Sequence, residues 1–176
     1  RAAMPAQAVK AELPATLSPE LATLVDKPPS SPEDWVFEIK FDGYRMLARI
    51  EGKSVKLVTR NGNDWTAKLR PLQQELLRLN LPDGWYDGEI VVHDENGKPN
   101  FGLLQLAFDG SDTAEIVYFL FDAPYLDGYD VRGQVLGMTA QHLKPGMWFK
   151  AKTEVGDGAF RRLAQPSTLL LVDRGR

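Results

Sequence analysis

The sequence contains no cysteine, which excludes a disulfide framework and any thiolate metal site. It has two histidines, His93 and His142, and neither has a partner at the spacing typical of metal ligands. No apolar run approaches the ~18 residues that a membrane-spanning helix needs. The alanine- and proline-rich start, RAAMPAQAVKAELPA, lacks the apolar stretch of a secretory signal. We therefore expect a cytoplasmic protein with no membrane attachment.

The chain also has little net charge, −3 over 176 residues, but its charges are segregated. Residues 35–70 hold 8 basic and 4 acidic side chains, residues 71–130 hold 2 and 12, and residues 131–176 hold 8 and 3. Such segregation permits a local phosphate-binding surface that the total conceals. The alternative is that solvated faces of one sign happen to cluster.

Periodicity indicates an α+β fold with mostly antiparallel sheets and flanking helices, because short strands occur without a regular strand–helix–strand rhythm. A helix is expected over 66–80, where leucines are spaced three and four apart, and a short one after Ser18. The stretch 101–108 is a short helix or a turn. Strands are expected at 36–41, 44–50, 55–59, up to Val92, 115–125, 147–155 and 167–173.

The most distinctive stretch is FEIKFDGYRM, residues 37–46. Glu38 and Lys40 share one face of an alternating strand, and Gly43 then turns the chain onto Arg45. A lysine nucleophile must lose its proton, which requires desolvation or a nearby positive charge such as Arg45 or a metal ion. On spacing alone, an exposed lysine beside an Asp-Gly turn is the alternative interpretation.

The segment EIKFDGYR resembles the Glu-x-Lys-x-Asp-Gly-x-Arg signature of covalent nucleotidyltransferases, and specifically of ATP-dependent DNA ligases. Further stretches similar to that family follow in its order: TRNGNDWT, DGEIVV, FGLLQ, YFLFDAPYLDGYDVR and WFKAK. From about residue 12 to residue 132 the chain most resembles the bacterial non-homologous end-joining ligases that work with Ku, and the likeness is patchy afterwards. The ordered series carries the resemblance, rather than any one stretch.

The resemblance implies a role for each matched position. Lys40 would be the nucleophile that forms lysyl-AMP with ATP, and Asp42 with Gly43 would shape the loop after it. Taken singly, each position also has an ordinary structural interpretation, such as a solvated turn or strand face. The nucleotide-binding positions would be Glu38, Arg45, Arg60 for the sugar, Glu89 for the ribose and the metal, Phe121 for the adenine, and Lys150 and Lys152 for the phosphate.

The fold implied by the resemblance is the ATP-grasp-like adenylation fold of DNA ligases, here incomplete. Its parts would be an N-terminal tail and short helix (1–34), the adenylation core (35–135) and a shortened remainder (136–176) without a complete OB domain. The implied cofactors are ATP and Mg²⁺ or Mn²⁺. The implied partners are nicked or broken double-stranded DNA, Ku, and polymerase and nuclease domains of a larger parent protein, acting in DNA repair at the bacterial nucleoid.

The segment QVLGMTAQHLKPGM departs from the family pattern. At this place, before WFKAK, the family has a Glu-Gly-x-x-x-Lys motif whose glutamate binds the catalytic metal, and no such motif is present. Two alternatives therefore stay open. One is a ligase-derived remnant that binds ATP or DNA without sealing a strand. The other is a different covalent nucleotidyltransferase, an RNA ligase or a capping guanylyltransferase.

Overall fold

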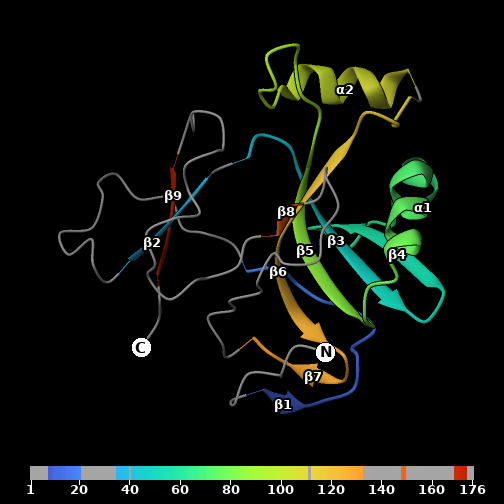
Figure 1. Cartoon of the computed structure of the whole chain (residues 1–176), viewed down its shortest axis with the longest axis vertical. Coiled ribbons are helices and arrows are strands. Elements are labelled where there is room, and N and C mark those ends of the chain that lie inside the picture. The colour runs from blue at the N-terminus through green and yellow to red at the C-terminus, as the bar shows by residue number, and fades with distance from the viewer. Residues whose placement is uncertain are drawn as a thin grey trace.

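The structure is a computed structural model that describes residues 8–20, 35–39, 41–110, 112–132, 148–149 and 169–173. Its core is an antiparallel sheet with one helix against the sheet and one helix at its end (Figure 1). This arrangement confirms the α+β fold expected from the sequence. The short helix expected after Ser18 falls mostly on residues 21–34, which lie outside the described residues, and Pro19 and Glu20 are not helical.

The main sheet pairs strands that lie far apart in the sequence. All neighbours are antiparallel except β8 (Trp148–Phe149), which pairs parallel with β6. A separate antiparallel pair consists of β2 (Trp35–Ile39) and β9 (Leu169–Asp173). In spatial order, the other strands are β1 (Val9–Lys10), β7 (Tyr129–Asp130), β6 (Val117–Leu126), β5 (Gly84–Val91), β3 (Tyr44–Glu51) and β4 (Ser54–Thr59).

The strand expected over 36–41 begins one residue earlier and ends earlier, because β2 stops at Ile39. Phe41 lies outside any strand, and Lys40 lies outside the described residues. The strand expected over 115–125 starts two residues later, at Val117. Of the strand expected over 147–155, the structure describes only β8, so the rest of that prediction lies outside the described residues.

The helix expected over 66–80 is present in two parts. A 3-10 turn, η2 (Thr66–Leu69), leads into α1 (Arg70–Leu79), which has proline in its first turn, where a missing N–H costs nothing. The helix ends at Asn80 in the left-handed conformation, with φ 50°. The stretch whose structure the sequence left open is a helix, α2 (Phe101–Asp109), capped by the Asn100 side chain, which accepts from the Leu103 N–H at 3.1 Å.

Side chains along β3 alternate between two buried faces. Met46, Ala48 and Ile50 belong to the main hydrophobic core, which includes the buried leucines of α1 and Leu104 of α2. On the opposite face, Leu47 packs with Trp85 and Tyr125 in a second, smaller cluster. Both faces of the sheet are therefore covered, one by helices and the other by a different part of the chain.

The cover on the second face is the N-terminal strap, residues 8–20. Its Ala11, Leu13 and Leu17 pack against the smaller cluster. The indole N–H of Trp85 donates to the Pro14 carbonyl at 2.9 Å, and the Arg49 Nε donates to the same carbonyl at 3.1 Å. Part of the segment that composition assigns to a tail is thus packed on the sheet.

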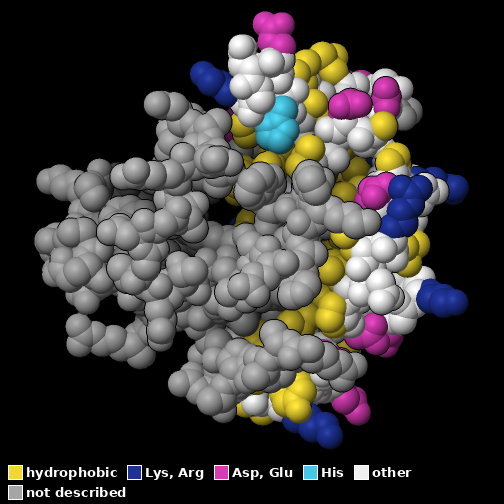
Figure 2. Space-filling view, viewed as in Figure 1, with side chains coloured by type: hydrophobic (Ala, Val, Ile, Leu, Met, Phe, Trp, Pro, Cys, Tyr) yellow, Lys and Arg dark blue, Asp and Glu magenta, His cyan; other side chains and the backbone are white. Residues whose placement is uncertain are grey.

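The visible face of the described surface carries charges of both signs. In Figure 2, lysine and arginine side chains alternate there with aspartate and glutamate side chains, without gathering into one basic patch. A phosphate-binding surface made by residues 35–70 therefore stays a prediction. Neither α1, α2 nor any other helix in the described part of the chain has the length and hydrophobicity to cross a membrane.

Candidate functional site

Three neighbouring strands bring Arg45, Glu89 and Phe119 into one row. The register of the sheet pairs Arg45 of β3 with Glu89 of β5, and Glu89 with Phe119 of β6. Residues directly opposite on antiparallel strands point to the same face, so the three side chains are neighbours. The row continues to the backbone of Trp148 in β8, which pairs with Phe119. This row lies on the face that also carries the N-terminal strap.

A partly buried ion pair lies on this face. The guanidinium of Arg45 donates from Nε to Asp87 Oδ1 at 2.6 Å and from Nη2 to Oδ2 at 2.7 Å. Burial opposes the charge on Arg45, but the hydrogen bond and charge of Asp87, with the charge of Glu89, leave the pKa of Arg45 above its ordinary value. Burial raises the pKa of Asp87, and the same arginine opposes that rise. Arg45 is therefore the charge partner that offsets part of the cost of burying this carboxylate.

The same guanidinium covers an aromatic ring. The Arg45 Cζ lies 4.4 Å from the centroid of Phe121, in the geometry of a cation–π contact. Its Nη2 also donates to the Glu20 carbonyl of the N-terminal strap at 3.4 Å. Phe121 is half-buried, which suits a ring that offers part of its surface to a ligand.

The Asp42-Gly43 turn is held against β5. The Gly43 N–H donates to Glu89 Oε1 at 3.1 Å, and this bond joins two stretches 46 residues apart. A Cβ on Gly43 would lie 2.0 Å from the Ile90 carbonyl oxygen, so only glycine allows this approach. Tertiary structure thus places the turn after the lysine beside the glutamate that the sequence analysis assigned to ribose and metal.

Two further rings, Phe41 and His93, pack against Phe119 at the β6 end of the row. Phe41 stacks on Phe119, with centroids 4.3 Å apart and planes inclined by 16°. His93, to which the sequence gave no role, packs edge-on against the same ring at 5.7 Å. Because Phe41 directly follows Lys40 in the sequence, this contact with Phe119 holds the chain beside the expected nucleophile against β6.

The other positions proposed from the sequence are Arg60 and four whose side chains lie outside the described residues. Arg60 is exposed in the turn after β4 and, within the described part of the chain, shares no hydrogen bond or ion pair with the row. Its neighbour Thr59 pairs with Met46, so the same register extended by one residue would set Arg60 opposite Arg45. Lys40, Lys150 and Lys152 lie outside the described residues, as does the side chain of Glu38.

Asp87 is the member of the site that the sequence analysis missed. It sits two residues before Glu89 in the DGEIVV stretch and points to the same face of β5. An acidic residue inside an otherwise buried strand, on a sheet that also contains Arg45, was the available signal. What the sequence lacked was the register that sets the two strands side by side.

The donor set limits which metal chemistry fits. Among the described residues, no group of three histidine, aspartate or glutamate side chains could hold a metal ion. Glu89 is a half-buried carboxylate of the row, and Asp87 is engaged by Arg45. Such a set fits Mg²⁺ or Mn²⁺ bound by one carboxylate together with oxygen atoms of a phosphate substrate, rather than by a protein cage.

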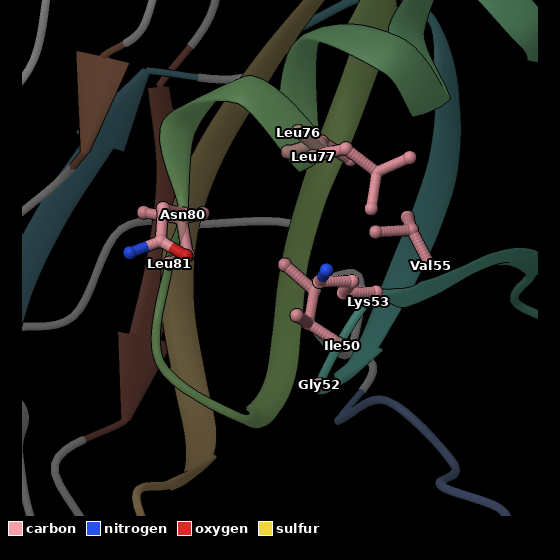
Figure 3. Close-up of a pocket in the computed structure, with 8 residues that line it drawn as sticks. All are labelled: Ile50, Gly52, Lys53, Val55, Leu76, Leu77, Asn80 and Leu81. Carbon is pink, nitrogen blue, oxygen red and sulfur yellow. The ribbon is translucent and has the colours of Figure 1, made fainter.

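A cavity of about 360 Å³ lies elsewhere, between the β3–β4 hairpin and the end of α1 (Figure 3). Its lining includes Ile50 and Val55 of the main core, so it opens on the helix side of the sheet, opposite to Arg45 and Glu89. It is mostly apolar with one lysine, Lys53. The cavity therefore does not belong to the row of candidate functional residues.

The chain matches known proteins over most of its length. Residues 15–145 match the family model of the ATP dependent DNA ligase domain. The multifunctional non-homologous end joining protein LigD of Pseudomonas aeruginosa is 47% identical over 127 residues, covering 72% of this chain and 15% of that protein. LigD of Mycobacterium tuberculosis is 38% identical over 120 residues, covering 66% of this chain and 15% of that protein.

Among solved structures, the chain is similar to a mycobacterial DNA ligase D complexed with ATP and MES. The TM-score is 0.53 at 34% identity, and the match covers 65% of this chain and 37% of that one. The chain thus spans a small part of the length of the relatives it matches.

Proposed function

Because the chain belongs to the ATP-dependent DNA ligase domain family, we propose that it is a ligase adenylation domain in which Lys40 accepts AMP from ATP. The observation that carries the proposal is the hydrogen bond from Gly43 to Glu89, which joins the lysine motif to the strand of the glutamate motif. The ATP named with the similar mycobacterial structure supports adenosine as the nucleoside.

The first step is attack by the Lys40 amine on the α-phosphorus of ATP, after the amine has given its proton to solvent. A phosphorus–nitrogen bond forms, the bond from the α-phosphorus to the oxygen that bridges to the β-phosphate breaks, and pyrophosphate leaves with the electron pair. The nitrogen then gives a second proton to solvent, which leaves the neutral phosphoramidate nitrogen. An oxygen of a DNA 5′-phosphate then attacks the same phosphorus, and the phosphorus–nitrogen bond breaks as the lysine nitrogen takes up a proton and leaves as the amine. Finally the neighbouring 3′-hydroxyl attacks the 5′-phosphorus, loses its proton and releases AMP, which seals the strand.

The remaining residues hold the nucleotide in place, which supplies rate by positioning and by neutralising charge. Glu38 and Arg45 are assigned to nucleotide binding, and Asp42 with Gly43 to shaping the turn after the lysine. Further nucleotide contacts are assigned to Arg60 and Glu89 for ribose, Phe121 for the base, and Lys150 and Lys152 for the phosphate.

Glu89 is the residue proposed to hold a divalent metal, Mg²⁺ or Mn²⁺. A metal bound there would neutralise charge on the triphosphate as pyrophosphate leaves. One carboxylate beside a phosphate substrate suits both ions.

The parent activity is proposed from the relatives. LigD proteins are named for non-homologous end joining, so broken or nicked double-stranded DNA is the proposed substrate. Ku and the polymerase and nuclease domains of a larger parent are proposed partners, with the bacterial cytoplasm and nucleoid as the location. Binding to DNA through lysine and arginine would weaken steeply with salt.

Intact mass spectrometry of the purified chain tests the proposal. The chain is incubated with ATP and Mg²⁺ or Mn²⁺ beside a Lys40→Ala variant. We expect a gain of one AMP in the chain and none in the variant. A gain that survives in Lys40→Ala would reject Lys40 as the nucleophile.

A ligase-derived remnant without catalysis is the second candidate. It is favoured by the missing Glu-Gly-x-x-x-Lys motif. ATP binding by calorimetry without any gain of mass would select this candidate. A gain of GMP from GTP, in place of AMP from ATP, would instead select a capping-type nucleotidyltransferase.

A further inference from the structure

Asp87 is a buried carboxylate with a narrow set of partners. The residue is 4% exposed, and both of its oxygens accept from Arg45. A carboxylate in such a place is costly unless charge-assisted hydrogen bonds satisfy it, so its presence calls for a function beyond filling space. Since two parallel bonds join the fork of the guanidinium to the carboxylate, they fix the plane of Arg45 as well as its position.

The fixed guanidinium in turn covers one face of Phe121, with its Cζ 4.4 Å from the ring centroid. An aromatic ring has two faces, and a cation held over one of them leaves the other for a flat ligand. The ring itself comes from β6, whereas Arg45 comes from β3 and Asp87 from the strand between them. Three strands therefore contribute to the orientation of a single aromatic ring.

We propose that Asp87 is a positioning residue for base binding, which holds Arg45 against Phe121 and so fixes that ring as the platform on which the nucleotide base stacks. The inference rests on the proposed function, because it takes Phe121 as the base platform. Asp87 itself touches neither the nucleotide nor the reacting atoms. Its effect is on the affinity for the nucleotide rather than on the attack of the lysine.

A second set of an aspartate, an arginine and an aromatic residue, here a tyrosine, provides a matched control. Asp130 accepts from Arg132 at 2.7 Å, and the Arg132 Cζ lies 4.8 Å from the centroid of Tyr125. This second set is more exposed, with 24% of the Asp130 side chain and 55% of the Arg132 side chain accessible, against 5% and 25% for the first pair. It lies by β7, away from the row of Arg45 and Glu89.

The test compares Asp87→Asn with Asp130→Asn in the full chain. Two quantities are measured for adenylation: the maximal rate, and the ATP concentration that gives half of it. Asp87→Asn keeps the shape of the side chain but removes the charge that fixes Arg45. We therefore expect the half-saturating ATP concentration to rise about tenfold, which is the size of change expected when the cation–π contact that orders the ring is lost. The maximal rate should stay within about twofold, since the lysine is not touched. Asp130→Asn should match the unaltered chain in both.

A double-variant cycle separates this role from a merely structural one. If Asp87 acts through the ring, Phe121→Leu and Asp87→Asn should raise the half-saturating concentration together by little more than either does alone. Independent effects that multiply would overturn the proposal. So would an unchanged half-saturating concentration in Asp87→Asn, or a fall in maximal rate alone.

Arg45→Lys keeps a positive charge facing Asp87, and it keeps the proposal falsifiable should Asp87→Asn fail to fold. Lysine cannot form the two-bonded fork, so the same loss of affinity is expected, and a normal half-saturating concentration would overturn the proposal. Thermal unfolding checks that each variant is folded.

If the unaltered chain forms no lysyl-AMP, the proposal that Lys40 is the nucleophile fails. Calorimetry then gives the ATP dissociation constants of the same variants, and these still decide whether Asp87 positions the ring. A chain that neither reacts with ATP nor binds it overturns both.

Discussion

Replacing Gly43 by alanine should damage both the stability of the fold and adenylation. The added Cβ would lie 2.0 Å from the carbonyl oxygen of Ile90 and 2.9 Å from a methyl group of Val91. The carbonyl belongs to a neighbouring strand in the ladder of β3 and β5, so it cannot move aside as the end of a flexible side chain would. The turn must therefore lift away from β5.

The cost can be estimated from its two parts. Overpacking of a rigid interior costs about 1–3 kcal/mol of unfolding free energy. Lifting the turn also breaks the 3.1 Å hydrogen bond from Gly43 to the Glu89 carboxylate, and a bond to a charged group contributes about 1.5–3 kcal/mol. Because Glu89 is half-buried and water can replace part of that bond, the expected total is about 2–4 kcal/mol.

Urea unfolding of Gly43→Ala beside Gly52→Ala measures the effect. Gly52 has open space around its missing Cβ but a φ of +56°, so its substitution costs only backbone strain, about 1–2 kcal/mol. Gly43→Ala should lose more stability than this control and should form lysyl-AMP more slowly at an equal folded fraction. Equal losses in the two variants, with normal adenylation in both, would refute the reasoning from steric approach.

Three further changes test other parts of the structure. Trp85→Phe removes the 2.9 Å indole bond to the Pro14 carbonyl and should cost about 1 kcal/mol, with faster proteolysis of the N-terminal strap; unchanged proteolysis would contradict the packing of that strap. Tyr118→Phe removes a buried hydroxyl whose one proton is shared between the carbonyls of Met46 and Tyr86, at 2.7 and 3.1 Å, and should lower the unfolding free energy by about 1–2 kcal/mol, measured in urea. The Arg132 side chain lowers the pKa of Asp130 to about 2, below its ordinary 3.8, so the stability that this carboxylate contributes is present above pH 4 and lost as pH falls through 2. Because Arg132 is largely exposed, Asp130→Asn should cost less than about 1 kcal/mol at pH 7 and less again at pH 2, and a difference that grew on acidification would contradict this sign.

Local patterns in the sequence predicted most of the elements. The alternation over 44–50 and 55–59 corresponds to the β3–β4 hairpin, and the leucine spacing over 66–80 corresponds to η2 and α1. These features depend on contacts between residues close in the chain, which periodicity records directly. The motif around Lys40 also belongs to this class, because its residue types and spacing lie within ten positions.

The assembly of the site required the tertiary structure. Arg45, Asp87 and Phe121 come from three strands separated by long stretches of chain, and nothing local specifies the register that brings them together. The N-terminal strap has the composition of a tail, yet three of its apolar side chains pack on the sheet.

What the sequence by itself determined was therefore the family, the α+β class and the residue types that chemistry needs. Only the tertiary structure decided that Asp87 is a partner of Arg45 and that Gly43 bonds Glu89. The physical reason is that hydrogen bonds and ion pairs between strands depend on register, which is a property of the whole sheet. The role of a buried acidic residue in one strand can be inferred only when the residue beside it on the neighbouring strand is known.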